Sequence, residues 1–203
     1  MPEPDWRQER KSGMAAIAAS VAISAIIWVA LWQLLPPLSG MDSLEPRMLV
    51  ALKCGAFATL FCFVAGIEAV AHERLQSNAF DPLLGHQTER LRVNLRYLQN
   101  TLEQLIVFVV GLFGLAAYLD SGSAMRIVIA STVVWILNRF AFWIGYHRSA
   151  AMRGLGAPSM VIGLVMLLYV VARIGGDIAG TAGTIVAIAL FLALEAVLFL
   201  KTR

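Results

Sequence analysis

Long apolar runs separated by short polar segments dominate this sequence. Six of them are candidate membrane spans: residues 14–35, 48–71, 98–118, 125–146, 158–174 and 182–200. A helix needs roughly 20 mostly apolar residues to cross a bilayer, and its backbone groups must be paired within the segment. The runs lack the alternation of polar and apolar residues that is typical of barrel strands. The pattern therefore predicts six transmembrane helices.

Composition excludes several classes of protein. Of the 203 residues, 59% are hydrophobic and 14% are charged, and the mean hydropathy is +0.75. A soluble domain carries about 25% charged residues. Soluble enzymes, disordered tails and nucleic-acid-binding domains are all disfavoured, and we expect no nucleic-acid partner. The fold class that remains is an all-α integral membrane helical bundle.

Basic residues indicate an orientation. With six spans and both termini in the cytoplasm, eleven basic residues face inward and four face outward, as the positive-inside rule requires. The inward set is Arg7, Arg10, Lys11, Arg74, Arg90, Arg92, Arg96, Arg148, Arg153, Lys201 and Arg203. The outward set is Arg47, Lys53, Arg126 and Arg173. We therefore expect a bacterial inner-membrane protein with its chemistry on the cytoplasmic side.

A polar stripe enters the third predicted span. Its members Arg92, Arg96, Asn100 and Glu103 are three or four residues apart, so they share one helix face. A carboxylate inside a span is costly unless it is paired or hydrated. Two interpretations stay open for Glu103: a ligand contact, or an ion pair with Arg96 or another helix that only fixes packing.

A second polar cluster ends the fourth predicted span. Arg139, Tyr146, Arg148 and Arg153 lie along it. Tyr146 would also suit an aromatic-belt anchor, and Arg148 and Arg153 would also suit ordinary cytoplasmic charges. Arg139 lies about two turns inside the span and needs a partner. Glu68, near the same end of the second span, is the candidate.

Together the two clusters predict a site for a small peptide-like anion. Arginines would bind its carboxylates and Glu103 its ammonium group. If the ligand carries a thiol, a neighbouring arginine would favour the thiolate. A free thiol has a pKa of about 8.5, and lowering it by two units takes about 2.7 kcal/mol. An ion pair at ~4 Å and an effective dielectric of 20 contributes about 4 kcal/mol, so one arginine is sufficient.

These residues resemble a known family. The segment Arg96-Tyr97-Leu98-Gln99-Asn100-Thr101-Leu102-Glu103 is similar to the Arg-x-x-x-Asn-x-x-Glu signature of the MAPEG superfamily, the membrane-associated proteins of eicosanoid and glutathione metabolism. The segment from Gly145 to Arg153 resembles the end of that family's third core helix, as in leukotriene C synthases and bacterial members. The resemblance covers about residues 48–175. It implies four-helix subunits that form trimers, with glutathione bound between neighbouring subunits near the cytoplasmic face.

The resemblance also implies roles for individual residues. Arg96, Asn100 and Glu103 would bind the peptide and charged ends of glutathione, and Arg153 would stabilise its thiolate as the catalytic residue. The other implied substrate-binding residues are Arg92, Tyr146, Arg148, Arg74 and Arg139. The sequence departs from the leukotriene C synthase pattern at Phe142 and Gln104, where that pattern has tyrosines, and at Leu98, where it has glutamine.

Domain organisation follows from the same comparison. Residues 48–175 would form the four-helix core, residues 1–47 a cytoplasmic N-terminus and an extra first helix, and residues 176–203 an extra last helix. The extra helices would cover the outer surface of a trimer or would line a lipid entrance between subunits.

Two functions remain open from the sequence. The first is a membrane-bound glutathione-dependent transferase or peroxidase that acts on hydrophobic electrophiles, with glutathione as cosubstrate. The second is a non-enzymatic lipid-binding scaffold, or a small transporter that uses Glu68, Arg139 and Glu195. We expect no metal, because His72, His86 and His147 lack partners at helical spacing.

Overall fold

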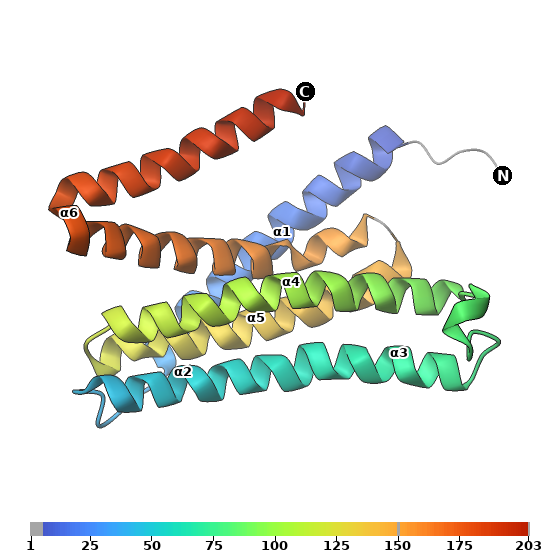
Figure 1. Ribbon diagram of the computed structural model, residues 1–203, viewed down its shortest axis with the longest axis horizontal. Helices are drawn as coiled ribbons and strands as arrows, with labels where there is room; N and C mark the ends of the chain where they lie inside the picture. The colour runs from blue at the N-terminus through green and yellow to red at the C-terminus, as the bar shows by residue number, and fades with distance from the viewer. Residues whose placement is uncertain (1–5, 150, 203) are drawn as a thin grey trace.

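The computed structural model describes residues 6–149 and 151–202, and these residues form helices joined by short connections (Figure 1). Arg203, one of the predicted cytoplasmic charges, lies outside the described residues. The elements in order are α1 (Trp6–Leu34), α2 (Leu44–Ala58), the π-helical η1 (Thr59–Val64), α3 (Ala65–Leu75), the 3-10 helix η2 (Pro82–Leu84), α4 (Glu89–Tyr118), α5 (Gly122–Arg148), the 3-10 helix η3 (Met152–Gly156) and α6 (Ala157–Lys201).

Five segments of the described chain are long and apolar enough to cross a membrane, so the prediction of six is wrong. They are Arg7–Leu34, Leu44–Leu75, Glu89–Tyr118, Gly122–Arg148 and Met152–Lys201. The first four contain the first four predicted spans, except that Leu35 lies one residue beyond the end of α1. The last two predicted spans both belong to α6, a single element of 45 residues.

A bend explains why two predicted spans became one element. Ala179 (φ −138°, ψ 25°) and Gly180 (φ 59°, ψ −147°) leave the helical conformation, and the helix resumes after them. The positive φ of Gly180 is a conformation that glycine adopts readily and other residues rarely do. The second arm of α6 then runs back beside the first near the bend (Figure 1), where Thr184 Oγ1 donates a hydrogen bond to the carbonyl of Ala172 (3.1 Å). Helix therefore continues through most of the glycine-rich stretch 175–180.

The core lies between α2, α4 and α5, which run alternately in opposite directions (Figure 1). At its centre Phe108 of α4 stacks on Trp135 of α5, with ring centroids 4.6 Å apart. Small residues of α2, among them Ala51 and Ala58, are fully buried and let the helices approach closely. Met166 of α6 closes the cluster from the other side.

The π-helical turn η1 has a partner on α4. A π-helix changes the backbone hydrogen-bonding pattern, and such turns often occur near functional sites. The hydroxyl of Tyr97 donates to the carbonyl of Cys62 within η1 (3.0 Å). Tyr97 is fully buried, so this contact fixes α4 against the second span one turn before Thr101.

α1 is fastened to α5 by polar side chains, a feature that its apolar sequence does not indicate. Ser24 Oγ donates to Asn138 Oδ1 (3.1 Å), and Asn138 Nδ2 donates back to Ser24 Oγ (2.9 Å). One turn further on, Trp28 Nε1 donates to Ser131 Oγ (3.0 Å). The start of α1, the start of α4 and the end of α5 lie at one end of the bundle (Figure 1). The polar residues of the two sequence motifs gather at this end.

Candidate functional site

The polar stripe of α4 begins at a capped helix start. Thr88 precedes α4, and its Oγ1 accepts a hydrogen bond from the backbone N–H of Leu91 (3.0 Å), which satisfies one of the unpaired N–H groups of the first turn. The same hydroxyl donates to Glu73 Oε1 of α3 (2.7 Å). The cap therefore fixes the start of α4 against α3, and Arg92 and Arg96 follow in the next turns of α4.

η3 brings the second motif back against α5. After α5 ends, Ser149 Oγ accepts a hydrogen bond from the N–H of Met152 (3.2 Å), which starts the turn. Gly156 then approaches α5 so closely that an added Cβ would lie 2.3 Å from Cβ of Phe142. A larger residue at position 156 would push η3 away from α5. The glycine therefore keeps Arg153 near Tyr146.

The two motifs meet at one cavity. It has a volume of about 420 Å³, within the range of small-molecule sites, and it lies between α4, α5, η3 and the start of α6. Five of the predicted site residues line it: Arg96, Asn100, Glu103, Tyr146 and Arg153. Of the positions that depart from the leukotriene C synthase pattern, Phe142 and Gln104 line it as well.

Glu103 forms no ion pair with an arginine among the described residues. Its Oε1 accepts a hydrogen bond from Gln99 Nε2 (3.2 Å), and its side chain is exposed. Within the described residues Arg96 and Glu103 form no ion pair. Of the two interpretations, the intrahelical pair with Arg96 is therefore wrong, and the carboxylate is available to a cation of a ligand.

Arg139 lies beneath the cavity and does not line it. Its side chain is fully buried, and its guanidinium donates to Asn100 Oδ1 (3.0 Å) and Thr101 Oγ1 (2.7 Å). The guanidinium carbon also lies 4.6 Å from the ring centroid of Phe142 and 5.3 Å from that of Tyr97, within reach of cation–π attraction. Arg139 thus connects α5 to the polar stripe of α4.

Glu68 is not the partner of Arg139, so that prediction is wrong. Its side chain is 63% exposed, and its Oε2 lies 3.7 Å from Nε2 of His72 on the same helix. The sequence pointed to Glu68 because it carries the opposite charge at a similar depth. The Arg139 guanidinium instead donates hydrogen bonds to the neutral side-chain oxygens of Asn100 and Thr101 on α4.

A chain of amide and hydroxyl groups extends from Asn100 to α6. Gln104 Nε2 donates to Asn100 Oδ1 (3.2 Å), and Ser159 Oγ donates to Gln104 Oε1 (2.7 Å). Two donors, from Arg139 and Gln104, therefore fix the orientation of the Asn100 amide. Its Nδ2 has no hydrogen bond within the described residues and can donate to a ligand. Sequence reasoning missed Ser159 and the role of Gln104, because neither carries a charge that stands out in an apolar run.

Arg92 and Arg148 line a neighbouring cavity of about 720 Å³ at the end of the bundle. Arg96 and Tyr146 lie between the two cavities, since they line both. Asn94 also lines this second cavity, where its Oδ1 accepts a hydrogen bond from Trp143 Nε1 (2.9 Å) and lies 3.0 Å from Nε2 of His147. Sequence reasoning missed Asn94 as well.

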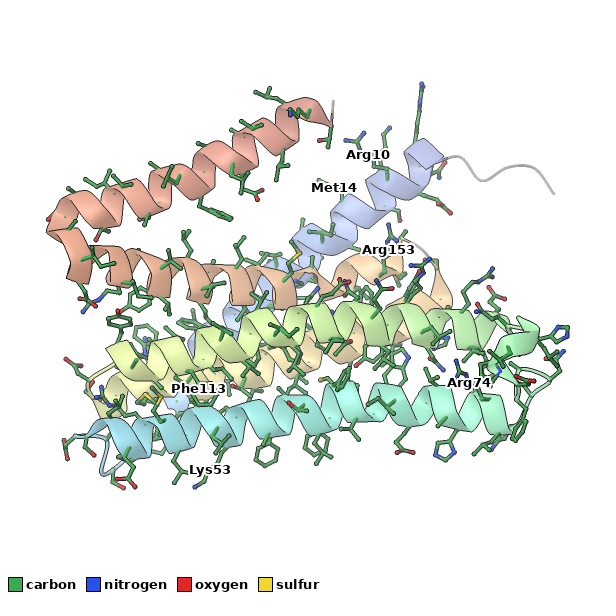
Figure 2. The ribbon with its side chains drawn as sticks, viewed as in Figure 1. Arg10, Met14, Lys53, Arg74, Phe113 and Arg153 are labelled. Atoms are coloured by element: carbon green, nitrogen blue, oxygen red, sulfur yellow. The ribbon has the colours of Figure 1, made fainter. Side chains whose placement is uncertain are left out.

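Arg74 lines neither cavity, although its neighbour Glu73 lines the second. Arg74 belongs to the last turn of α3, and in Figure 2 α4 and α5 lie between it and Arg153. Its Nε is buried and has no hydrogen bond among the described residues. Within one chain, Arg74 therefore does not line the cavity shared by Arg96, Asn100 and Arg153.

The remaining predictions concern a metal site and the residues of a possible transporter. Across residues 6–149 and 151–202, no three His, Cys, Asp or Glu side chains are grouped to hold a metal ion. Glu195 lies exposed on the second arm of α6 and Glu68 lies exposed on α3, whereas Arg139 is buried within the bundle. The three residues considered for a transporter thus line none of the cavities described in this chain.

Comparison with known proteins identifies a family. The sequence profile of the MAPEG family matches residues 49–175, more than half of the chain. This match confirms the predicted resemblance, over nearly the same residues. At the stringency used, no curated protein and no solved structure matches the chain.

Proposed function

The chain belongs to the MAPEG family, and from this premise we propose that it is a membrane-bound, glutathione-dependent transferase or peroxidase of hydrophobic electrophiles. The observation that carries the proposal is the cavity of about 420 Å³ lined by Arg96, Asn100, Glu103, Tyr146 and Arg153. Those residues come from two separate motifs and form one site between α4, α5 and η3.

The side chains of the cavity complement glutathione. Glutathione has two carboxylates, one ammonium group, two amides and a thiol. Arg96 pairs with a carboxylate and Glu103 with the ammonium group, through charge-assisted hydrogen bonds. Asn100 Nδ2 donates to a peptide carbonyl, supported by the orientation that Arg139 and Gln104 impose on its amide.

Arg153 stabilises the thiolate. A thiol with the usual pKa of about 8.5 is about 3% ionised at pH 7, and a pKa two units lower makes it about three quarters ionised. That change takes about 2.7 kcal/mol, less than the roughly 4 kcal/mol of an ion pair at ~4 Å near a protein surface. One guanidinium beside the sulfur is therefore sufficient, and the thiolate is the nucleophile.

Two reactions follow from a bound thiolate. With an activated double bond, the sulfur forms a bond to the electrophilic carbon, and the adjacent carbon takes a proton from water, so that nothing leaves. With an organic hydroperoxide, the sulfur attacks the terminal oxygen, the O–O bond breaks, and the alkoxide leaves and is protonated to the alcohol. The glutathione sulfenic acid then reacts with a second glutathione to give the disulfide and water.

We expect the enzyme to act as a homotrimer in the bacterial inner membrane, with this end of the bundle in the cytoplasm. Arg74 does not line the cavity of its own chain, and a neighbouring copy in a trimer would give it a way to reach a ligand. The eleven-to-four distribution of basic residues supports the orientation.

The thiolate itself provides the test. Glutathione is added to the purified protein at pH 7 and the ultraviolet absorbance of the thiolate is recorded, for the parent protein, Arg153→Ala and the matched control Lys11→Ala. We expect a thiolate signal in the parent and in Lys11→Ala, and a signal about twenty times smaller in Arg153→Ala. Absence of the signal in the parent protein while glutathione is bound would sink the mechanism.

The apolar cavity beside α1, of about 520 Å³, supports a second candidate function, a non-enzymatic lipid-binding scaffold. Such a scaffold would bind lipid but leave glutathione un-ionised. The same absorbance measurement therefore separates the two functions.

A further inference from the structure

The cavity of about 720 Å³ at the end of the bundle, called the end cavity below, carries positive charge that the chain itself does not neutralise. Four arginines line it: Arg90, Arg92, Arg96 and Arg148. Among residues 6–149 and 151–202, none of these arginines forms an ion pair with a carboxylate. Cations that gather around one cavity attract anions into it. The end cavity is therefore suited to a ligand with anionic groups.

Two carboxylates line the end cavity as well. Glu89 is exposed in the first turn of α4 and forms no ion pair among the described residues. Glu73 accepts a hydrogen bond from Thr88 Oγ1 through Oε1 (2.7 Å), which leaves its other oxygen for a further donor. These carboxylates repel a simple anion such as phosphate, but they bind the ammonium group of a ligand that carries both signs of charge. The ligand that matches the whole set has at least two anionic groups and one cationic group.

One wall of the end cavity is fixed by contacts within the protein. The buried Asn94 accepts a hydrogen bond from Trp143 Nε1 (2.9 Å), and its Oδ1 lies 3.0 Å from Nε2 of His147. The ring of Trp143 stacks on that of Tyr97, with centroids 4.4 Å apart. A wall that is already ordered loses little freedom when a ligand binds. The end cavity thus combines a rigid wall with exposed arginines.

The end cavity borders the glutathione cavity. Arg96 and Tyr146 line both, whereas Arg153 lines the glutathione cavity and not the end cavity. Two ligands that occupy the two cavities together would therefore meet at Arg96 and Tyr146. A ligand in the end cavity lies on the far side of these residues from the guanidinium that would hold the thiolate.

The peroxidase reaction requires two glutathione molecules. The first, held beside Arg153, takes an oxygen from the hydroperoxide and becomes the sulfenic acid. The second must then bring its sulfur to that sulfenic acid. Its two carboxylates and one ammonium group are the charges that the end cavity matches.

We propose that the end cavity binds the second glutathione of the peroxidase reaction. Arginines of the end cavity bind its carboxylates, Glu89 binds its ammonium group, and its thiol lies toward Tyr146. The sulfur of the second glutathione bonds to the sulfenic sulfur, the S–O bond breaks, and the leaving hydroxide takes the thiol proton to form water. The disulfide product then lies across both cavities. The proposal rests on the glutathione function proposed above and assigns a site to its second substrate molecule.

The first test measures binding with two ligands that do not react. Glutathione disulfide contains two joined glutathiones and would fill both cavities, whereas S-methylglutathione would fill the glutathione cavity. Arg90 lines the end cavity and not the glutathione cavity, and Lys11, an exposed cation of α1, lines neither. In calorimetry, Arg90→Gln should raise the Kd of the disulfide about two- to five-fold, as is typical of an exposed ion pair. Lys11→Gln should leave it unchanged, and Arg90→Lys should restore most of the affinity.

S-methylglutathione provides the internal control for these variants. Its Kd at the tighter site should be the same in the parent protein, Arg90→Gln and Lys11→Gln. A Kd of the disulfide that does not respond to Arg90→Gln would overturn the proposal. Equal losses for the disulfide and S-methylglutathione would also overturn it, because the effect would then belong to the first glutathione.

The second test compares two reactions of the same variants. Reduction of cumene hydroperoxide consumes two glutathiones, and conjugation of methyl vinyl ketone consumes one. Arg90→Gln should raise the KM for glutathione about two- to five-fold in the reduction and leave it unchanged in the conjugation. Lys11→Gln should leave both unchanged. An equal rise in both reactions, which a general structural defect would produce, refutes the proposal.

Binding and thiolate formation together keep the two proposals apart. If the disulfide depends on Arg90 but the parent protein gives no thiolate signal with bound glutathione, the end cavity stands as a glutathione site and the proposed function fails. If the thiolate forms and methyl vinyl ketone is conjugated, but the disulfide does not depend on Arg90, the proposed function stands. The end cavity is then refuted as the site of the second glutathione.

Discussion

Arg139→Met should weaken glutathione binding although Arg139 does not line the cavity. Its guanidinium donates to Asn100 Oδ1 (3.0 Å) and to Thr101 Oγ1 (2.7 Å). A hydrogen bond from a charged donor contributes about 1.5–3 kcal/mol. Without it, Gln104 Nε2 at 3.2 Å is the remaining donor to Asn100 Oδ1 among the described residues. The amide then turns more freely, and its Nδ2 is no longer held toward the ligand.

The expected loss follows from the bond to Asn100. We take the lower end of the range, about 1.5 kcal/mol, because Gln104 stays in place. This loss corresponds to a Kd for glutathione about ten-fold higher. Isothermal titration calorimetry of the purified protein in lipid nanodiscs measures the Kd, and thermal unfolding of the same samples reports whether the fold is retained.

Thr101→Val is the matched control for this prediction. It removes the other hydrogen bond of the Arg139 guanidinium and keeps the one to Asn100. Both variants should unfold at lower temperature, since each leaves a buried polar group with fewer partners. The Kd should rise in Arg139→Met alone. A Kd within two-fold of the parent in Arg139→Met, or the same rise in both variants, would refute the reasoning.

Three further substitutions test the packing around the site. In Gly156→Val the new Cβ would lie 2.3 Å from Cβ of Phe142. We therefore expect the free energy of unfolding to fall by about 1–3 kcal/mol and the Kd for glutathione to rise. An unchanged Kd would show that η3 does not position the site. Ser24→Ala removes both hydrogen bonds with Asn138 and should lower the free energy of unfolding by about 1–2 kcal/mol in denaturant titrations, and no change would mean that these bonds do not fasten α1. Gly180→Ala puts a side chain on a residue with φ 59° and ψ −147°, a strain that costs about 1–3 kcal/mol. Spin labels on the two arms of α6 should then show a longer or broader distance distribution. An unaltered distribution counts against the bend as described.

Helical spacing was sufficient to predict how the site residues gather. Arg96, Asn100 and Glu103 share one face because α4 is helical throughout, and that face borders the cavity. The approach of Tyr146 and Arg153 to the same cavity was expected from the two polar clusters taken together and from the family resemblance. Spacing along one helix does not report how neighbouring helices are rotated about their axes, so it does not identify contacts between them. For that reason the sequence suggested Glu68 for Arg139, whereas the rotation of α4 presents Asn100 and Thr101.

The bend in α6 marks another limit of sequence patterns. The length of an apolar run reports how much chain can lie in hydrocarbon, and the distribution of charges reports on which side each end should lie. Neither reports how the chain reverses between two runs. In α6 two residues, Ala179 and Gly180, are sufficient, and the second arm runs back alongside the first near the bend (Figure 1). Because only these two residues leave the helical conformation, helix continues on both sides of the reversal and few backbone groups lose their helical partners.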